Sequence, residues 1–261
     1  MDAHTVAELS DLNYHEALRE QARRAGGTAY DEGGLLLIAG SHPHPMLNNV
    51  VRTDPALAPG RVLQRAAAFF GARGRGHALM LRHGERDQEL FEMALAVGMT
   101  ELLGPPAMVL RAPPADPTLP AGIELRVAHD VEDVRDFAAV AADAWSTYGL
   151  PPEMVNSVFS CPEQMLAPHF LCTTAYDGPR PVAAALIVLS HGIAGVYWVS
   201  TREDVRGRGL GAAVTAAVTR AGFARGAAFV SLQATPMGAP VYERLGFEEI
   251  FRYRILIRSA S

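Results

Sequence analysis

Apolar positions in the second half of the chain follow two different periods. Residues Ile123–Ala128 alternate between apolar and polar, as a half-buried strand does. The apolar residues of 130–145 recur at helical spacing, and Asp130 precedes them where a helix N-cap belongs. Further apolar runs predict strands at 170–176, 181–189, 195–201 and 229–235, and helices at 210–225 and 238–245. The predicted order is a strand, helices, three antiparallel strands, a helix, a strand, a helix and a last strand.

The first half of the chain carries a weaker version of the same order. Its apolar runs predict strands at 34–39, 49–52, 77–82 and 107–111, and helices at 59–71 and 87–98. The glycine-rich segment Gly71–Gly76 follows a predicted helix and precedes a predicted strand. A phosphate-binding turn requires the reverse order, so we interpret this segment as a loop.

A proline-rich stretch divides the two halves. Residues Ala112–Ala121 contain four prolines in ten positions, and each proline removes a backbone donor and disfavours helix in the residue before it. We therefore predict two domains, 1–112 and 122–261, joined by a linker at 113–121.

Composition restricts the classes of function. The chain has 261 residues and a formal net charge of −5, which does not favour a nucleic acid or an anionic membrane surface as partner. No apolar run approaches the roughly 20 residues of a membrane span, and the N-terminus lacks the order of a signal peptide. The two cysteines, Cys161 and Cys172, match neither a disulfide framework nor a zinc site. We expect a cytoplasmic enzyme without a metal, and a homodimer stays open.

The segment Val205–Gly211 carries the most specific chemistry. It reads Val-Arg-Gly-Arg-Gly-Leu-Gly and fits the pattern R-x-x-G-x-G through Arg206, Gly209 and Gly211. Glycines leave backbone N–H groups unshielded at a helix start, where the unpaired donors and the positive end of the helix dipole attract anions such as a pyrophosphate. A P-loop would need Gly-Lys-Ser/Thr, but alanines follow the last glycine, and the G-x-G-x-x-G fingerprint of dinucleotide-binding folds is also absent.

Together with a downstream segment, this turn resembles a known superfamily. Residues 241–247 read Val-Tyr-Glu-Arg-Leu-Gly-Phe, and the two motifs at this separation are similar to the acetyl-CoA-binding core of the GNAT (GCN5-related N-acetyltransferase) superfamily. The resemblance implies an α/β (α+β) fold with a mixed, mostly antiparallel twisted sheet flanked by helices. It covers 122–261 as a complete domain. The first domain resembles a degenerate GNAT half that lacks the glycine turn, as in tandem members.

The resemblance also implies where the cosubstrate acetyl-CoA binds. In this fold the strands on either side of the glycine-turn helix separate, and pantetheine lies between them. Backbone groups of Trp198 and Val199 would pair with it, although one aromatic residue of this strand is expected to face the core. The pyrophosphate would bind the backbone amides of the turn, with a charge-assisted contribution from the first arginine. The implied turn residues are Arg206, Gly207, Arg208, Gly209, Leu210, Gly211 and Ala212.

The implied chemistry is acyl transfer from a thioester to an amine. It requires a neutral amine, a polarised carbonyl and a protonated thiolate leaving group. A backbone amide near Val199 would polarise the carbonyl. Tyr242 stands where many members carry the tyrosine that protonates the departing sulfur, and a phenol of pKa about 10 suits that role. The alternative is that Tyr242 only packs against the cofactor.

The general base is not assigned by the sequence. Candidates by residue type alone are Asp143, Glu153, His169 and His191. Deprotonation through ordered water, or arrival of an already neutral amine, is equally open. His42 and His44 lie two residues apart on a proline-rich segment without further ligands, so we expect a turn or simple packing there rather than a metal site.

We therefore predict an acetyl-CoA-dependent N-acetyltransferase that acts on an amine of a small molecule or a peptide. The rival hypothesis is a non-catalytic acyl-CoA sensor or interaction module that retains the cofactor groove. The acceptor amine and the use of longer acyl-CoAs are not determined by these patterns, since acceptor specificity resides in loops and in the first domain.

Overall fold

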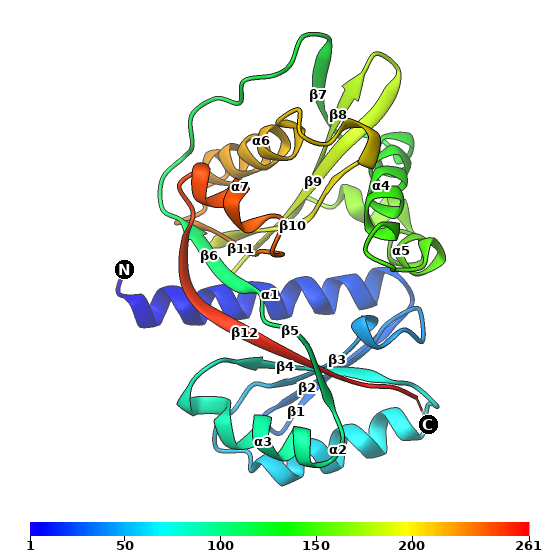
Figure 1. Cartoon of the computed structure of the whole chain (residues 1–261), viewed down its shortest axis with the longest axis vertical. Helices are drawn as coiled ribbons and strands as arrows, with labels where there is room; N and C mark the ends of the chain where they lie inside the picture. Colours follow the sequence, from blue (N-terminus) through cyan, green and yellow to red (C-terminus); the bar gives the residue numbers. More distant parts are fainter. Residues whose placement is uncertain (261) are drawn as a thin grey trace. The chain divides into compact units, whose positions relative to one another are not determined.

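The computed structural model describes residues 1–260 as two compact units (Figure 1). Unit 1 consists of Met1–Ala17 and Ala107–Ile250. Unit 2 consists of Leu18–Pro106 and the chain from Phe251 onward. Each unit has its own apolar core.

The sheet of unit 1 has the strand order β6-β11-β10-β9-β8-β7. Its strands are β6 (Pro106–Leu110), β7 (Ile123–Val127), β8 (Phe170–Asp177), β9 (Arg180–Ser190), β10 (Ile193–Thr201) and β11 (Val230–Gln233). Strands β10 and β11 pair in parallel, whereas the other neighbours are antiparallel. Because a parallel pair needs a crossover, helix α6 (Leu210–Ala224) connects them.

Helices cover both faces of this sheet. Besides α6 they are α1 (Ala3–Arg24, whose first part belongs to unit 1), α4 (Val131–Ser146), α5 (Pro152–Val158) and α7 (Ala239–Arg244), with 3-10 turns η3 (Pro162–Leu166) and η4 (Glu203–Val205). Helix α6 packs on Ala194 and Val230, whereas α1 packs through Val6 on Ile193 and Phe229. Successive strand residues face opposite ways, so α1 and α6 lie on opposite faces.

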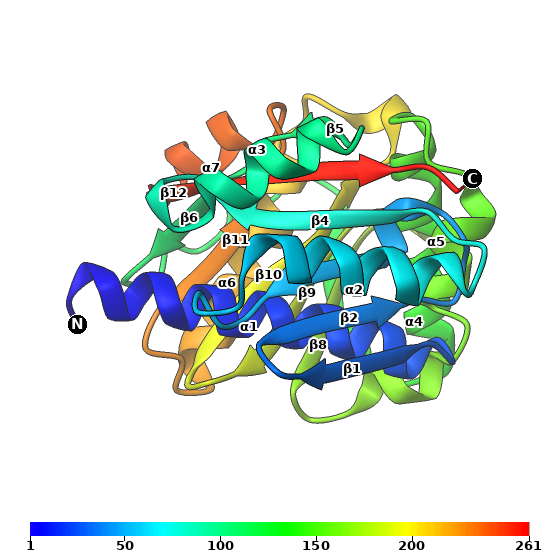
Figure 2. The same cartoon turned by 90° about the horizontal axis from the view of Figure 1, so that it is seen from below.

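The sheet of unit 2 has the order β1-β2-β3-β4-β12, with β5 on the other edge of β12. Its strands are β1 (Thr28–Glu32), β2 (Leu35–Ala39), β3 (Asn48–Arg52), β4 (His77–Arg82), β5 (Thr100–Leu103) and the end of β12 (Glu248–Arg258). Helices α2 (Pro59–Gly71) and α3 (Gln88–Ala96) pack on one face, and η1 (Pro45–Leu47) and η2 (Glu85–Asp87) are 3-10 turns (Figure 2). Strands β3 and β4 are parallel, with α2 as their crossover.

Two strands do not belong to the sheet that the predicted domains, 1–112 and 122–261, would assign them to. Strand β6 pairs with β11 in unit 1, where Leu110 faces Val230. The end of β12 pairs with β4 and β5 in unit 2, where Ile255 faces Met80 on one side and Leu103 on the other. The reason is that strand pairing joins residues far apart in the chain, and a local apolar pattern does not identify the sheet edge that a strand completes.

The proline-rich stretch belongs to unit 1 and is fixed to α6. Arg220 donates a hydrogen bond to the carbonyl oxygen of Pro114 (2.8 Å) and forms an ion pair with Asp116 (2.8 Å). The stretch connects β6 to β7 within one unit, so it is not a free tether between two separate domains.

The expected fold class, a mixed α/β arrangement with largely antiparallel sheets flanked by helices, is confirmed. Asp130 is the N-cap of α4, where its carboxylate accepts a hydrogen bond from the amide of Asp133 (3.0 Å). Residues 72–76 form the loop that the sequence predicted. Helices α1 and α5 and strands β1 and β5 were not individually predicted. Among residues 1–260, no helix is both long and apolar enough to cross a membrane.

Candidate active site

The glycine turn forms the start of α6. Gly207 and Gly209 have φ angles of 80° and 79°, in the left-handed region that favours glycine, and Gly209 is the N-cap of the helix. A Cβ at either residue would meet no atom within 4 Å. The amide of Ala213 bonds to the carbonyl oxygen of Gly209 (3.0 Å), and helix geometry leaves the amides before it without intrahelical acceptors. The turn therefore has the form of an anion-binding helix start.

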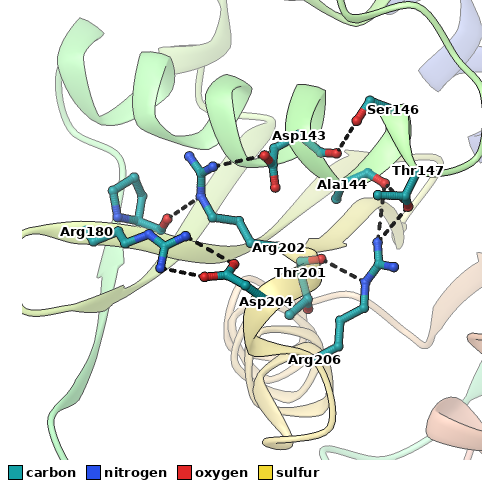
Figure 3. A network of polar contacts seen from close by, with 10 residues as sticks. Asp143, Ala144, Ser146, Thr147, Arg180, Thr201, Arg202, Asp204 and Arg206 are labelled. Carbon is teal, nitrogen blue, oxygen red and sulfur yellow. Dashed lines mark hydrogen bonds and ion pairs between the residues drawn. The ribbon is translucent and has the colours of Figure 1, made fainter.

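The Arg206 side chain extends toward the C-terminal end of α4 (Figure 3). Its guanidinium donates hydrogen bonds to the carbonyl oxygens of Thr201 (3.2 Å) and Ala144 (3.4 Å) and to Oγ1 of Thr147 (2.8 Å). A cation is favourable here because it satisfies a terminal helix carbonyl and complements the negative end of the dipole. Arg206 thus joins the glycine turn to α4, and the anion-binding donors of the turn are its backbone amides.

Further ion pairs hold the segments around the turn. They join Arg180 to Asp204 (2.8 Å), Arg202 to Asp143 (3.2 Å) and Arg208 to Asp177 (3.2 Å), and the first two are drawn in Figure 3. Each pair is partly exposed, so none contributes much to stability alone. Arg202 also donates to the carbonyl oxygen of Pro181 (2.8 Å). The loop between β10 and α6 is therefore fixed to β9 and α4.

Strand β10 contains a bulge directly before this loop. Its register with β9 shifts between Tyr197 and Ser200, so Trp198 and Val199 together face Ala185. Trp198 has a φ of 54°, an unfavourable angle for a bulky side chain. Such a conformation persists only where the surrounding structure enforces it, and it is typical of ligand sites.

The bulge also marks the point where β10 and β11 stop pairing. Their parallel register covers Ala194–Val196 and Val230–Leu232 and ends before Trp198. The backbone of Trp198 and Val199 therefore has no register partner on β11. These are the two residues at which the resemblance implies pairing with pantetheine.

The side chains of Trp145 on α4 and of Phe159, directly after α5, support the bulge. The indole Nε1 of Trp145 donates to Oγ of Ser200 (3.1 Å), and that hydroxyl donates to the carbonyl oxygen of Trp198 (3.0 Å). The Trp198 ring packs edge-on against Trp145 (5.6 Å between centroids) and Phe159 (5.2 Å). These contacts compensate for the strained backbone at Trp198.

Helix α1 holds the same strand through a side-chain amide. Asn13 donates to the carbonyl oxygen of Val188 (3.0 Å) and to Oγ of Ser190 (2.8 Å), and the Tyr197 hydroxyl donates to Asn13 Oδ1 (2.7 Å). A Cβ at Gly195 would overlap Oδ1 of Asn13, so this close approach requires glycine. Tyr197 therefore faces α1, and Trp198 faces Trp145 and Phe159.

Tyr242 lies on α7, where its side chain is buried. Its ring packs edge-on against Phe247 (6.0 Å), and a Cβ at Gly238 would come within 2.8 Å of it. Burial, with a smaller effect of Tyr148, raises the pKa of Tyr242 well above the usual value for tyrosine. The hydroxyl therefore keeps its proton at neutral pH.

The side chains considered as a general base do not converge on the bulge. They are Asp143, Glu153, His169 and His191. Asp143 pairs with Arg202. His191 lies in the tight turn before β10, seven residues and therefore about 23 Å of strand from Trp198. His169 precedes β8 at that same end, and Glu153 is exposed in the first turn of α5.

Other polar clusters have local roles. The amide of His44 bonds to Nδ1 of His42 (3.1 Å), and the amide of Met46 bonds to Nδ1 of His44 (3.3 Å), so both imidazoles stabilise the turn at η1. Burial lowers the pKa of His44, which favours this neutral acceptor form. At the start of α4, the exposed side chain of His129 lies 2.6 Å from the half-buried carboxylate of Asp133.

Four residues of this site were not singled out by the sequence. They are Asn13, Trp145, Tyr148 and Ser200. Tyr148 follows α4, and its hydroxyl contacts the sulfur of Met237, 89 positions away in the chain (3.2 Å). Such partners are distant in sequence, and no local motif identifies them.

Comparisons with known proteins agree with this fold. Residues 175–256 match the family model described as FR47-like protein. A GCN5-related N-acetyltransferase from Kribbella flavida superposes with a TM-score of 0.69 at 24% identity, over 93% of this chain and 94% of that chain. One from Sphaerobacter thermophilus gives 0.65 at 18% identity, over 88% and 82%. The comparison with curated proteins gives no match.

A third similar structure is a tandem GNAT protein from the clavulanic acid biosynthesis pathway, solved without AcCoA. Its TM-score is 0.60 at 15% identity, over 87% of this chain and 78% of that chain. At these identities the likeness concerns the fold. The chain therefore has the GNAT fold, and the resemblance inferred from the two motifs is confirmed.

Proposed function

We propose that unit 1 transfers the acetyl group of acetyl-CoA to an amine of a small molecule or a peptide. One observation carries this proposal: the bulge that ends the β10–β11 pairing stands directly before a glycine turn at a helix start. An anion site and a free strand edge are thus adjacent on one stretch of chain. Pyrophosphate and pantetheine, two consecutive parts of CoA, need such neighbouring sites.

The residues present fit this ligand. The amides of Gly207, Gly209 and the first turn of α6 would bind the pyrophosphate oxygens, since open space lies beside both glycines. The side chains of Arg206 and Arg208 are held by other protein groups, so backbone donors supply the specific contacts. The free edge at Trp198 and Val199 would pair with the amide groups of pantetheine.

The chain's own groups then support acyl transfer. The amide of Val199 donates to the thioester oxygen and stabilises the negative charge that develops there. The acceptor nitrogen forms a bond to the carbonyl carbon, the carbon–sulfur bond breaks, and the amine loses its proton to water. Tyr242 donates its proton to the departing sulfur and regains one from solvent.

Unit 2 is proposed not to bind acetyl-CoA. Its crossover helix α2 begins with Pro59, which lacks a backbone N–H, and no glycine turn precedes it. At the carboxyl ends of β3 and β4, buried Arg52 and Asp87 form an ion pair (2.7 Å), and Asp87 also accepts from the amide of Arg82 (3.0 Å). A carboxylate of the protein therefore occupies the region that an anionic ligand would need.

The test is release of CoA thiol from acetyl-CoA, measured with the full chain against a panel of amines, beside calorimetric binding of acetyl-CoA. We expect micromolar to submillimolar binding and amine-dependent release. Binding without release from any amine would favour the rival hypothesis of a non-catalytic acyl-CoA sensor. Absence of binding would exclude both.

A further inference from the structure

Four aromatic side chains form one continuous group beside the bulge, here named the aromatic cluster. It consists of Trp145 and Tyr148 near the end of α4, Phe159 after α5, and Trp198 in the bulge. The ring centroids of Trp145 lie 5.5 Å from Tyr148 and 5.6 Å from Trp198, and Phe159 lies 5.2 Å from Trp198. All four belong to unit 1.

The aromatic cluster is only partly covered. Phe159 is buried, Trp145 and Trp198 are half-buried, and Tyr148 is 46% exposed. A β-bulge does not by itself require a large side chain. The φ of 54° at Trp198 is energetically unfavourable for a tryptophan backbone. A strained aromatic residue that reaches the surface is typical of a position that contacts a ligand.

The polar groups around the aromatic cluster are already paired. Trp145 Nε1 bonds to Ser200, and the Tyr148 hydroxyl contacts Met237. The neighbouring charges are also engaged, because Arg206 bonds to α4 and Asp143 pairs with Arg202. The cluster therefore offers aromatic ring faces and edges to a ligand. Arg206 and Asp143 already pair with other groups of the protein.

We infer that the aromatic cluster binds the body of the acceptor, and that the acceptor is a primary amine carried on an apolar, aromatic group. This inference rests on the proposed function, which places the thioester carbonyl at Val199, next to Trp198. An attacking nitrogen has to approach that carbonyl to about 3–3.5 Å. The carbon skeleton behind the nitrogen then lies against the cluster, where aromatic groups stack favourably. Arg206 and Asp143 near the cluster already pair within the protein, which disfavours the additional charges of a polyamine.

The experiment compares three amines as acceptors with the full chain: 2-phenylethylamine, ethanolamine and spermidine. We expect a kcat/KM at least about tenfold higher for 2-phenylethylamine than for the other two. The chain has two tryptophans, Trp145 and Trp198, and both lie in the cluster. Intrinsic tryptophan emission therefore reports binding at this site without turnover, and 2-phenylethylamine should shift or quench it.

A pair of variants localises the effect. Tyr148→Ala removes an exposed ring of the cluster and should raise the KM for 2-phenylethylamine about tenfold while leaving the Kd of acetyl-CoA unchanged. Tyr30→Ala in unit 2 is the matched control, because Tyr30 is 49% exposed and also packs on one ring, that of Phe69 (5.3 Å). The control should keep the wild-type KM.

The outcomes separate this inference from the proposed function. A preference for spermidine or ethanolamine would overturn the inference and leave acetyl transfer intact. If no amine releases CoA, the proposed function fails, and the tryptophan emission then tests only whether the aromatic cluster binds an aromatic amine. An unchanged emission at saturating 2-phenylethylamine overturns binding at the aromatic cluster, whereas a shift that Tyr148→Ala weakens supports binding there.

Discussion

Single residues of the glycine turn can be tested against a control on the same helix. Gly209 begins α6 with a φ of 79°, and Gly226 follows its other end with a φ of 87°; a Cβ at either would meet no atom within 4 Å. Gly209→Ala and Gly226→Ala therefore add similar backbone strain, about 1 kcal/mol each. Only the methyl at Gly209 lies where the pyrophosphate is proposed to bind. Calorimetry should show acetyl-CoA weakened about tenfold by Gly209→Ala and unaffected by Gly226→Ala. Equal affinities of the two variants would exclude the turn as the phosphate site.

The hydroxyl of Tyr242 has a separable role. Tyr242→Phe keeps the ring that packs on Phe247 and removes the proposed proton donor. The kcat should fall by roughly 10²–10⁴-fold, the range for loss of a general acid, while the Kd of acetyl-CoA holds. Steady-state kinetics and calorimetry on the same preparation measure both quantities. Wild-type turnover in the variant would mean that Tyr242 only packs and that solvent protonates the thiolate.

We expect the free energy of unfolding to decrease at acidic pH because of His77 in unit 2. Burial, with a smaller effect of Arg258 across the strand pair, lowers its pKa from 6.5 to about 4, and its ring stacks on Phe70 (4.7 Å). The unfolded chain then binds the proton more readily than the folded chain below pH 6.5. The stability linked to His77 is complete above that pH and is lost as the pH falls toward 4, by up to about 3 kcal/mol. Urea unfolding at several pH values should show a smaller loss for His77→Phe than for wild type, and an unchanged loss for the exposed His83→Gln. Parallel pH profiles of wild type and His77→Phe would contradict the assignment.

Sequence alone could locate the glycine turn and Tyr242, because each belongs to a short contiguous motif. It could not predict the direction of the Arg206 side chain. The pattern R-x-x-G-x-G suggests a phosphate contact, but the guanidinium bonds to Ala144 and Thr147, about 60 positions earlier in the chain. That pairing depends on where α4 ends in space.

At the scale of elements, the bulge of β10 is held from α1 as well as from α4. Gly195→Ala would displace the Asn13 side chain, and with it the bonds to Val188 and Tyr197. We expect Gly195→Ala to cost about 2 kcal/mol and Asn13→Ala about 1–2 kcal/mol. Both substitutions disrupt the same contact. The double variant should therefore lose at least about 1 kcal/mol less stability than the sum of the losses of the two single variants. Urea unfolding followed by tryptophan emission measures unit 1, which holds both tryptophans. Additive costs would show that α1 does not restrain the strand through Asn13.

Elements with a strong local pattern were predicted within a few residues. Strand β10 and helix α6 are examples, since an apolar run and an Ala-rich run border the glycine turn. Helix α1 was missed because charged and polar residues dominate its 22 positions, and only a narrow apolar stripe faces the sheet. Strands β1 and β5 were missed because they are largely exposed and lack a clear buried face.

At the scale of the whole molecule, neither half of the sequence contains a complete sheet. Unit 1 uses β6 from before the proline-rich stretch, and unit 2 uses the end of β12 from the C-terminus. The proline-rich stretch lies between two similar orders of elements, but the chain crosses between the sheets on both sides of it. Fragments cut at 112 or 122 would expose unpaired strand edges. Tests of either unit therefore require the full chain.

The number of acetyl-CoA molecules bound per full chain tests the proposed difference between the units. Unit 1 has a glycine turn at its crossover helix, whereas unit 2 has Pro59 there and a buried Arg52–Asp87 ion pair at its strand ends. An anionic ligand would meet the carboxylate of Asp87 and would have to separate a buried pair, which typically costs several kcal/mol. We expect calorimetry to give one site per chain, and Gly209→Ala to weaken that site without revealing another. Two sites per chain, or a full-affinity site that survives Gly209→Ala, would show that unit 2 binds the cosubstrate and is not degenerate.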